Sequence, residues 1–314
     1  MFSDNVLDRW RTFKESAIGK QAIRVARILI FLGIIGFLVA QLAGIGWTEV
    51  LRNLPVQPWF YVLFVLLYVS LPVAETLMYR VTWKYDVLRA FPAFIKKRIY
   101  NRDVVGYAGE VYFFGWAKDH AGVPKRKAAE TIRDNNILSS VSSTLVSVGM
   151  LALFLSAGRL SLESLIGRPT MAWFVIAALV VAVLVLVWTR FRRFLFSMEW
   201  RHAGIIFGIQ VARLVVGQML QIGQWAVVMP EVSLDIWFTY AAISIILTRI
   251  PFLPNQQLIF TSLGIGLSGE LGMAKAAVSG MLIMAAALDK LINAALFGLI
   301  TLTGTDKVTA SREA

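Results

Sequence analysis

Long apolar runs constrain this chain most, because a helix of about 20 apolar residues crosses the hydrocarbon of a bilayer. The clearest runs are residues 28–46, 59–79, 137–158 and 170–189. Composition agrees, since 58% of the residues are hydrophobic and only 16% are charged, unlike a soluble domain. We therefore predict an all-α, polytopic transmembrane helix bundle that forms a single transmembrane domain over residues 28–304.

The C-terminal third is also apolar, but prolines and charged residues interrupt it. Three further stretches, 203–228, 236–268 and 276–304, bring the predicted total to about seven spans. Proline breaks or kinks a helix, so we expect 236–268 to contain a broken, re-entrant segment. The interrupting residues are Arg213, Arg249, Pro251, Pro254, Asp289 and Lys290.

The charges indicate a membrane topology. Lys and Arg number 31 against 19 Asp and Glu, a net charge of +12, and the cations gather before the first span and within 80–102, 118–133 and 190–201. By the positive-inside rule these segments and the N-terminus are cytoplasmic. We therefore predict a multi-pass protein of the bacterial inner membrane, and no nucleic-acid partner is implied.

Short segments flank the predicted membrane domain. Within residues 1–27, Val6, Trp10 and Phe13 share one helical face, which predicts an amphipathic helix on the cytoplasmic surface. The first apolar run lacks a small-residue cleavage pattern and is expected to stay as an anchor. Residues 305–314 form a polar tail, which is cytoplasmic if 236–268 returns to its side of entry and external if 236–254 is a full span.

The stretch GYAGEVYFFGW, Gly106 to Trp116, is apolar but too short to cross, and it carries Glu110. It lies between two cytoplasmic loops, so we predict a re-entrant or interfacial segment in which Gly106 and Gly109 allow tight turning. A carboxylate at membrane depth is costly and needs a partner. Glu110 is therefore expected either to face a protein-lined cavity or to pair with a nearby loop cation.

The longer stretch from Gly106 to Asn136 resembles the first signature of the lysylphosphatidylglycerol synthase transmembrane domain, also called the flippase-like family. Gly109 and Glu110 match its Gly-Glu pair, Gly122 has the expected spacing, and Asp134 with Asn135 lies near its acid-Arg position. The Arg of that position is absent. The resemblance implies an integral membrane protein that handles lipids.

The second family signature is present only in part. Its usual Gly-rich loop is shortened, its Glu is not identifiable, and its final Arg is replaced. The residues that carry the likeness are Leu253, Pro254, Gly272 and Ala276, with Gln257 as the nearest polar substitute for the Glu and Lys290 in place of the Arg.

The two halves of the chain, about 28–158 and 170–304, also mirror each other. Each has a span, a polar interruption beside an aromatic run and then an Ala-rich helix, with GEVYFFGW parallel to QQLIFTSLG. Interrupted segments at corresponding positions of two inverted halves indicate a transport site near the membrane midplane. We therefore predict an inverted internal repeat.

Several polar residues converge on the late spans. Gln210, Arg213, Gln221 and Gln224 fall in one arc of a helix. Asp289 could pair with Arg213 in the interior, and Glu75 lies in a span near Arg80. Such residues either join helices or line a substrate path. The candidate substrate-binding residues are Glu110, Arg213, Gln221, Gln224, Arg249, Gln257, Asp289 and Lys290.

Enzyme signatures are missing. The chain has no Cys and only two His, and it shows no His-Glu metal spacing, nucleophile elbow or P-loop, so we expect no cofactor, no metal and no catalytic residue.

The resemblance favours binding and translocation of a lipid or lipid-linked anionic substrate, with Arg213 or Arg249 holding a headgroup phosphate. Two alternatives stay open: a noncatalytic membrane subunit that docks a partner in envelope lipid or polysaccharide assembly, and an intramembrane acid–base enzyme using Glu110 and Asp289. A membrane-protein partner or a second copy of the chain is also left open.

Overall fold

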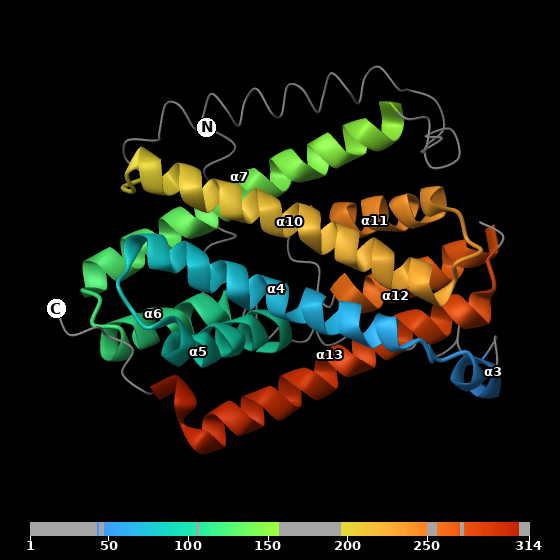
Figure 1. Ribbon diagram of the computed structural model, residues 1–314, viewed down its shortest axis with the longest axis horizontal. Coiled ribbons are helices and arrows are strands. Elements are labelled where there is room, and N and C mark those ends of the chain that lie inside the picture. The colour runs from blue at the N-terminus through green and yellow to red at the C-terminus, as the bar shows by residue number, and fades with distance from the viewer. Residues whose placement is uncertain are drawn as a thin grey trace, which may run out of the picture. The chain divides into compact units, whose positions relative to one another are not determined.

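The computed structural model describes residue 43 and residues 47–104, 107–156, 196–249, 256–270 and 273–307, and every regular element in these ranges is helical (Figure 1). The all-α prediction is therefore confirmed for this part of the chain. The elements are α3 (Trp47–Arg52), α4 (Pro58–Thr82), α5 (Val87–Ile99), a π-helical turn (Tyr100–Val104), α6 (Ala108–His120), α7 (Lys125–Ser156), α10 (Trp200–Val228), α11 (Leu234–Arg249), α12 (Gln256–Glu270), α13 (Lys275–Thr303) and a 3₁₀ turn (Thr305–Lys307).

Three of these helices, α4, α10 and α13, are long and apolar enough to cross a membrane. They cover the predicted spans 59–79, 203–228 and 276–304 almost residue for residue, which is consistent with a membrane-embedded protein. Residues 137–156 of the predicted span 137–158 lie in α7, which has 32 residues but is not among these three helices. The predicted spans 28–46 and 170–189, and the helix expected in residues 1–27, lie outside the described residues, so the total of seven spans stays a prediction.

The described residues divide into two compact units. One contains the chain up to Val56 together with Ile243–Ala286, and the other contains Gln57–Ala242 together with 287–314. These units do not coincide with the two halves of the predicted inverted repeat, which therefore also stays a prediction. In the first unit, a Cβ added at Gly280 of α13 would overlap the backbone carbonyl of Asn53, so a glycine permits the close approach of these segments.

Helices α4 and α10 form the centre of the second unit and pack along each other (Figure 1). Small residues of α10 face leucines of α4 there: a Cβ at Gly217 would lie 3.9 Å from Leu67, and one at Gly223 would lie 3.7 Å from Leu63. At these distances an added Cβ would make ordinary van der Waals contact with the leucines. Helix α7 packs on α10, and α5 and α6 pack beside α4 and α7.

Helices α5 and α6 are held together by aromatic rings. Phe94 of α5 and Phe113 of α6 have ring centroids 4.6 Å apart, and Phe113 is stacked on Trp83 and Trp116. Asp86 caps α5 by accepting hydrogen bonds from two backbone N–H groups of its first turn. Each helix has 13 residues, about 20 Å, which is shorter than the roughly 30 Å hydrocarbon core.

The segment predicted to be re-entrant is thus a short helix. From Ala108 onwards this segment is helix α6, so most of its backbone N–H and C=O groups bond within the helix. Later in the chain, the predicted interrupted stretch 236–268 contains α11 up to Arg249 and α12 from Gln256, and residues 250–255 between them lie outside the described residues. Gly106, Pro251 and Pro254 lie outside the described residues.

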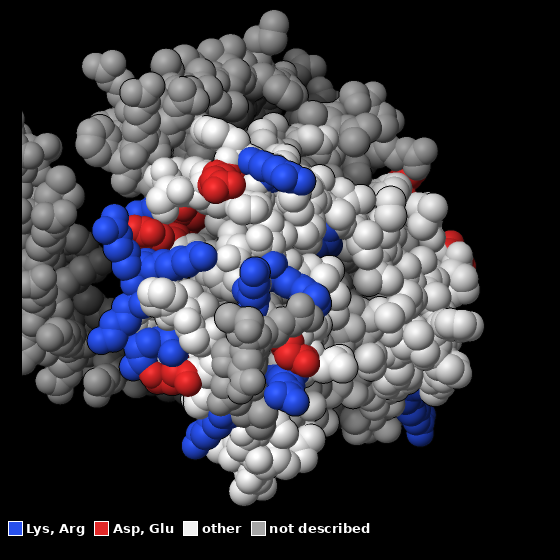
Figure 2. Space-filling model, turned by 60° about the vertical axis from the view of Figure 1, so that its left-hand side comes forward, with Lys and Arg blue, Asp and Glu red and all other residues white. Residues whose placement is uncertain are grey.

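Cations gather on one face of the molecule. Figure 2 shows this face, with Lys and Arg side chains close together and Asp and Glu among them. The exposed cations of the segments predicted to be cytoplasmic include Lys84, Arg89, Lys118, Lys125, Arg126, Lys127 and Arg201.

Candidate functional site

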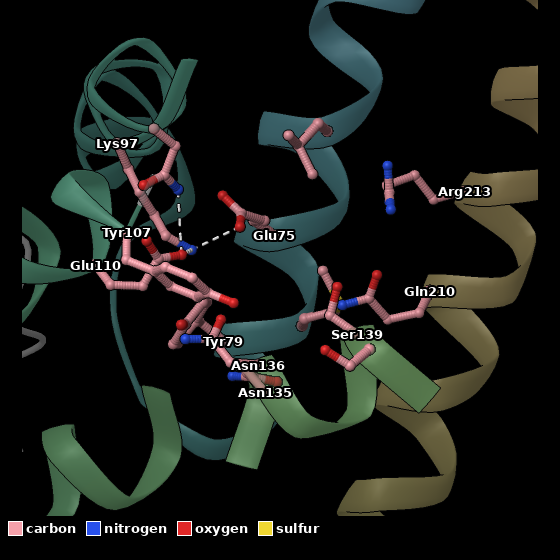
Figure 3. Close-up of a pocket in the computed structure, with 14 residues that line it drawn as sticks. Glu75, Tyr79, Lys97, Tyr107, Glu110, Asn135, Asn136, Ser139, Gln210 and Arg213 are labelled. Carbon is pink, nitrogen blue, oxygen red and sulfur yellow. Dashed lines mark hydrogen bonds and ion pairs between the residues drawn. The ribbon is translucent and has the colours of Figure 1, made fainter. Parts of the chain in front are cut away.

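A cavity of about 290 Å³ lies inside the second unit and is mostly polar (Figure 3). Five helices and the π turn contribute to its wall, so residues far apart in the sequence meet there. Its lining residues are Leu71, Glu75, Met78, Tyr79, Lys97, Asn101, Tyr107, Glu110, Asn135, Asn136, Ser139, Ser140, Gln210 and Arg213.

Lys97 of α5 is almost completely buried at one side of this cavity, with a side chain 1% exposed. Its Nζ lies 2.6 Å from Glu75 and 3.7 Å from Glu110, and it also lies over the rings of Tyr79 and Phe113. Burial alone would lower the pKa of Lys97, but the charges of Glu75 and Glu110, the Tyr79 hydroxyl and the hydrogen bond to Glu75 together outweigh it, and the pKa is raised above its ordinary value. Lys97 is therefore cationic at neutral pH.

Glu110 is positioned by the residue before it and by the π turn. The Gly109 N–H donates to Asn101 Oδ1 at 2.8 Å, and Asn101 Nδ2 donates to Glu110 Oε1 at 3.1 Å. A Cβ at Gly109 would overlap the backbone carbonyl of Lys97, so glycine lets α6 approach α5 this closely. The second carboxylate oxygen, Oε2, is buried at the cavity and has no hydrogen-bond partner among the described residues.

Arg213 and Gln210 of α10 form the opposite side of the cavity (Figure 3). Arg213 lies near the midpoint of this 29-residue helix. The described ranges contain no ion pair to it, and its buried Nε lacks a hydrogen-bond partner. Gln210 is 4% exposed, and its Oε1 is unpartnered too. A guanidinium is always charged, so this side of the cavity carries a positive charge, on which Glu75 acts from across the cavity without forming an ion pair with it.

Helix α7 supplies neutral polar groups to the same cavity, Asn135, Asn136, Ser139 and Ser140. The residue before them points elsewhere: Asp134 accepts from the backbone N–H and the hydroxyl of Ser197 at 2.9 Å each and pairs with Arg133. Of the two motif residues near the family's acid-Arg position, Asp134 therefore joins α7 to the segment before α10, and Asn135 lines the cavity.

Asp289 belongs to a different polar cluster, and the expected pair with Arg213 is not formed. The Arg98 guanidinium lies 2.9 Å from Asp289 Oδ1 and the Arg102 guanidinium lies 2.8 Å from Asp289 Oδ2, so Asp289 forms ion pairs with two other cations. Asn293 accepts from Arg98 and from the Tyr68 hydroxyl. Lys290 pairs with Asp103. Asp289 and Lys290 do not line the cavity, and the intramembrane pair of Glu110 with Asp289 is not brought together.

Two further predicted residues, Gln221 and Gln224, do not line the cavity. Gln224 donates to the carbonyl of Phe60 at 3.3 Å and so joins α10 to α4, and Gln221 donates to Gln224 at 3.0 Å within α10. Gly122 ends α6 with a φ of 63°, a conformation that favours glycine. Arg249 and Gln257 stand at helix ends, and their side chains lie outside the described residues.

Lys97 was not among the candidate residues predicted from the sequence, and Glu75 was noted only as lying in a span near Arg80. Lys97 was counted among loop cations because Lys96, Lys97 and Arg98 form a basic run. A usable signal was present, because Ala90, Ala93, Phe94 and Lys97 follow the spacing of one buried helical face.

No family model, curated protein or solved structure matches this chain. Within the described ranges, no group of three or more His, Asp or Glu side chains could hold a metal ion. The cavity and its charges therefore supply the evidence about function.

Proposed function

We propose that this chain is a flippase-like membrane protein that binds and translocates a lipid or lipid-linked substrate, with the anionic group of the headgroup held at Arg213. One observation carries the proposal: a half-buried arginine, whose buried Nε has no partner and which has no ion pair in the described residues, lines a polar cavity. A charge in that position is costly unless it meets an opposite charge, carbonyl groups or water. A phosphate suits it, because a guanidinium donates two parallel hydrogen bonds to phosphate oxygens.

The origin of the cavity residues supports the same function. Arg213 lies on α10, which is long enough to cross the membrane, whereas Glu110 lies on the short helix α6 within the family-like motif. A headgroup in the cavity would contact a spanning helix and a short helix together. Relative movement of these two helices is the step that would expose the headgroup to one side of the membrane or the other.

The test is the replacement of Arg213 by Gln, which removes the charge and keeps a polar side chain. Phosphate-containing lipids retained by the purified protein should fall by about 10- to 100-fold, the effect of losing a charge-assisted hydrogen bond. Arg213→Lys should fall in between, because an ammonium cannot form the bidentate contact. Native mass spectrometry measures retention, and transfer of a labelled lipid in proteoliposomes measures translocation.

The matched control is Arg126→Gln, which removes an arginine from an exposed pair with Glu130 on α7. It should leave lipid retention and transfer unchanged. Normal retention and transfer in Arg213→Gln would contradict the proposal. A protein partner that co-purifies stoichiometrically while no lipid is retained would favour the docking subunit instead, and a chemically altered lipid would favour an enzyme.

A further inference from the structure

The cavity holds two carboxylates and two cations, but they are unevenly placed. Lys97 lies between Glu75 and Glu110, so this side has one negative charge in excess. Arg213 stands on the other side with no ion pair in the described part of the chain, and Figure 3 shows the two sides facing each other across the cavity. The site is neutral as a whole and has a negative side and a positive side.

We infer that the cavity accepts a zwitterionic headgroup, whose phosphate binds Arg213 and whose primary ammonium binds Glu110. The inference rests on the proposed function and names the class of headgroup. A zwitterion satisfies both sides and leaves the site neutral. A purely anionic headgroup would pair with Arg213 but leave the excess negative charge of Glu75 and Glu110 buried, which is unfavourable.

The unpartnered atoms specify the two contacts. Glu110 Oε2 is a buried acceptor without a donor, whereas its Oε1 already accepts from Asn101. A primary ammonium has three N–H donors, so it fits this oxygen, and a quaternary ammonium cannot donate to it. On the opposite side, Arg213 Nε is a donor without an acceptor, which a phosphate oxygen supplies.

The wild-type protein provides the first measurement. The purified full chain is incubated with equal amounts of phosphatidylethanolamine, phosphatidylglycerol and phosphatidylcholine of the same acyl chains, and native mass spectrometry quantifies what is retained. We expect phosphatidylethanolamine to exceed each of the others by about tenfold, the effect of one charge-assisted hydrogen bond. Retention of phosphatidylglycerol or phosphatidylcholine equal to that of phosphatidylethanolamine would overturn the inference, and this comparison needs no variant.

The second measurement uses Glu110→Gln. Without the Glu110 charge, Glu75 neutralises Lys97 and only Arg213 stays unbalanced, so the preference should reverse in favour of phosphatidylglycerol. Glu130→Gln, which removes a carboxylate from an exposed pair on α7, is the matched control and should keep the wild-type preference. An unchanged ratio in Glu110→Gln would overturn the ammonium contact.

Further variants and ligands distinguish a failure of the zwitterion inference from a failure of the proposed function. Loss of all lipids in Arg213→Gln together with an unchanged ratio in Glu110→Gln would leave the proposed function standing and reject the zwitterion. Full retention in Arg213→Gln would reject the proposed function itself. Free phosphoethanolamine carries the same two charges, and we expect it to displace phosphatidylethanolamine only weakly; displacement at equal concentration would identify a soluble zwitterion, not a lipid, as the ligand.

Discussion

At the scale of single residues, Gly109 determines how closely α6 can approach α5. Its N–H donates to the Asn101 side chain, and any Cβ would overlap both that side chain and the backbone carbonyl of Lys97. The same approach brings Glu110 to Lys97 and to the cavity. The Gly-Glu pair of the family-like motif therefore has a physical reason in this chain, since the glycine sets the position of the acid.

We predict that Gly109→Ala destabilises the protein by about 1–3 kcal/mol, because a rigid carbonyl oxygen cannot move aside for the methyl group. Gly115→Ala on the same helix is the matched control. A Cβ there meets nothing within 4 Å, so the substitution should be neutral or stabilise the helix by up to about 1 kcal/mol. Thermal unfolding in detergent measures both. Equal unfolding temperatures would show that the close approach is unimportant.

At the scale of elements, α5 joins several parts of the second unit through three consecutive buried cations. Lys96 pairs with Asp306 of the 3₁₀ turn, Lys97 with Glu75 of α4 and Glu110 of α6, and Arg98 with Asp289 of α13. Successive residues of a helix point about 100° apart, so one short helix reaches partners on different sides. The pair with Asp306 fixes the residues after α13 against α5.

The Asp306 contact gives a pH prediction. Burial would raise the pKa of Asp306, but hydrogen bonds from Lys96 and Tyr112 outweigh it and hold the pKa below its usual value. A carboxyl with a lowered pKa in the folded state stabilises above its unfolded pKa of about 3.9 and loses that effect as pH falls through the lowered value. The 3₁₀ turn should therefore stay on α5 at pH 7 and detach only below about pH 4.

A pair of spin labels measures this detachment, and the absence of native Cys makes the labelling simple. Labels at cysteines replacing Lys118 and Lys307 should give a narrow distance distribution at pH 7 that broadens in acid. With Asp306→Asn the distribution should already be broad at pH 7. A narrow distribution in that variant would mean that other contacts hold the turn.

At the scale of the whole molecule, the sequence predicted the spanning helices better than the site. Hydropathy located α4, α10 and α13 because it depends on neighbouring residues. The cost of burying charge singled out Glu110 and Arg213 from the sequence, and both line one cavity. The ion-pair partners of the buried charges were not predictable in this way. Lys97 meets Glu110, and Arg98 and Arg102 meet Asp289, through tertiary packing, which the spacing of residues along one helix does not encode.

The orientation of the second unit in the membrane is a prediction at this scale. The Lys96–Asp306 pair places residues 305–307 beside α5, within the region predicted to be cytoplasmic, and so favours a cytoplasmic C-terminal tail over an external one. Cysteines at Lys125 and Lys307 should react with a membrane-impermeant reagent only from the cytoplasmic side, and a cysteine at Glu231 only from outside. External labelling at Lys307 would restore the competing topology.

The contacts of α5 also bear on how the protein is made. Asp289 and Asp306 follow Arg98 and Lys96 by 191 and 210 residues. At roughly 5–20 residues per second, the ribosome needs about 10–40 seconds to supply these counter-ions. Until then Lys96 and Arg98 lack these counter-ions. We therefore expect α5 to stay at the lipid–water boundary and to reach its final position only after the last helix has been inserted. We therefore expect assembly of this charged centre to be a late step of biosynthesis.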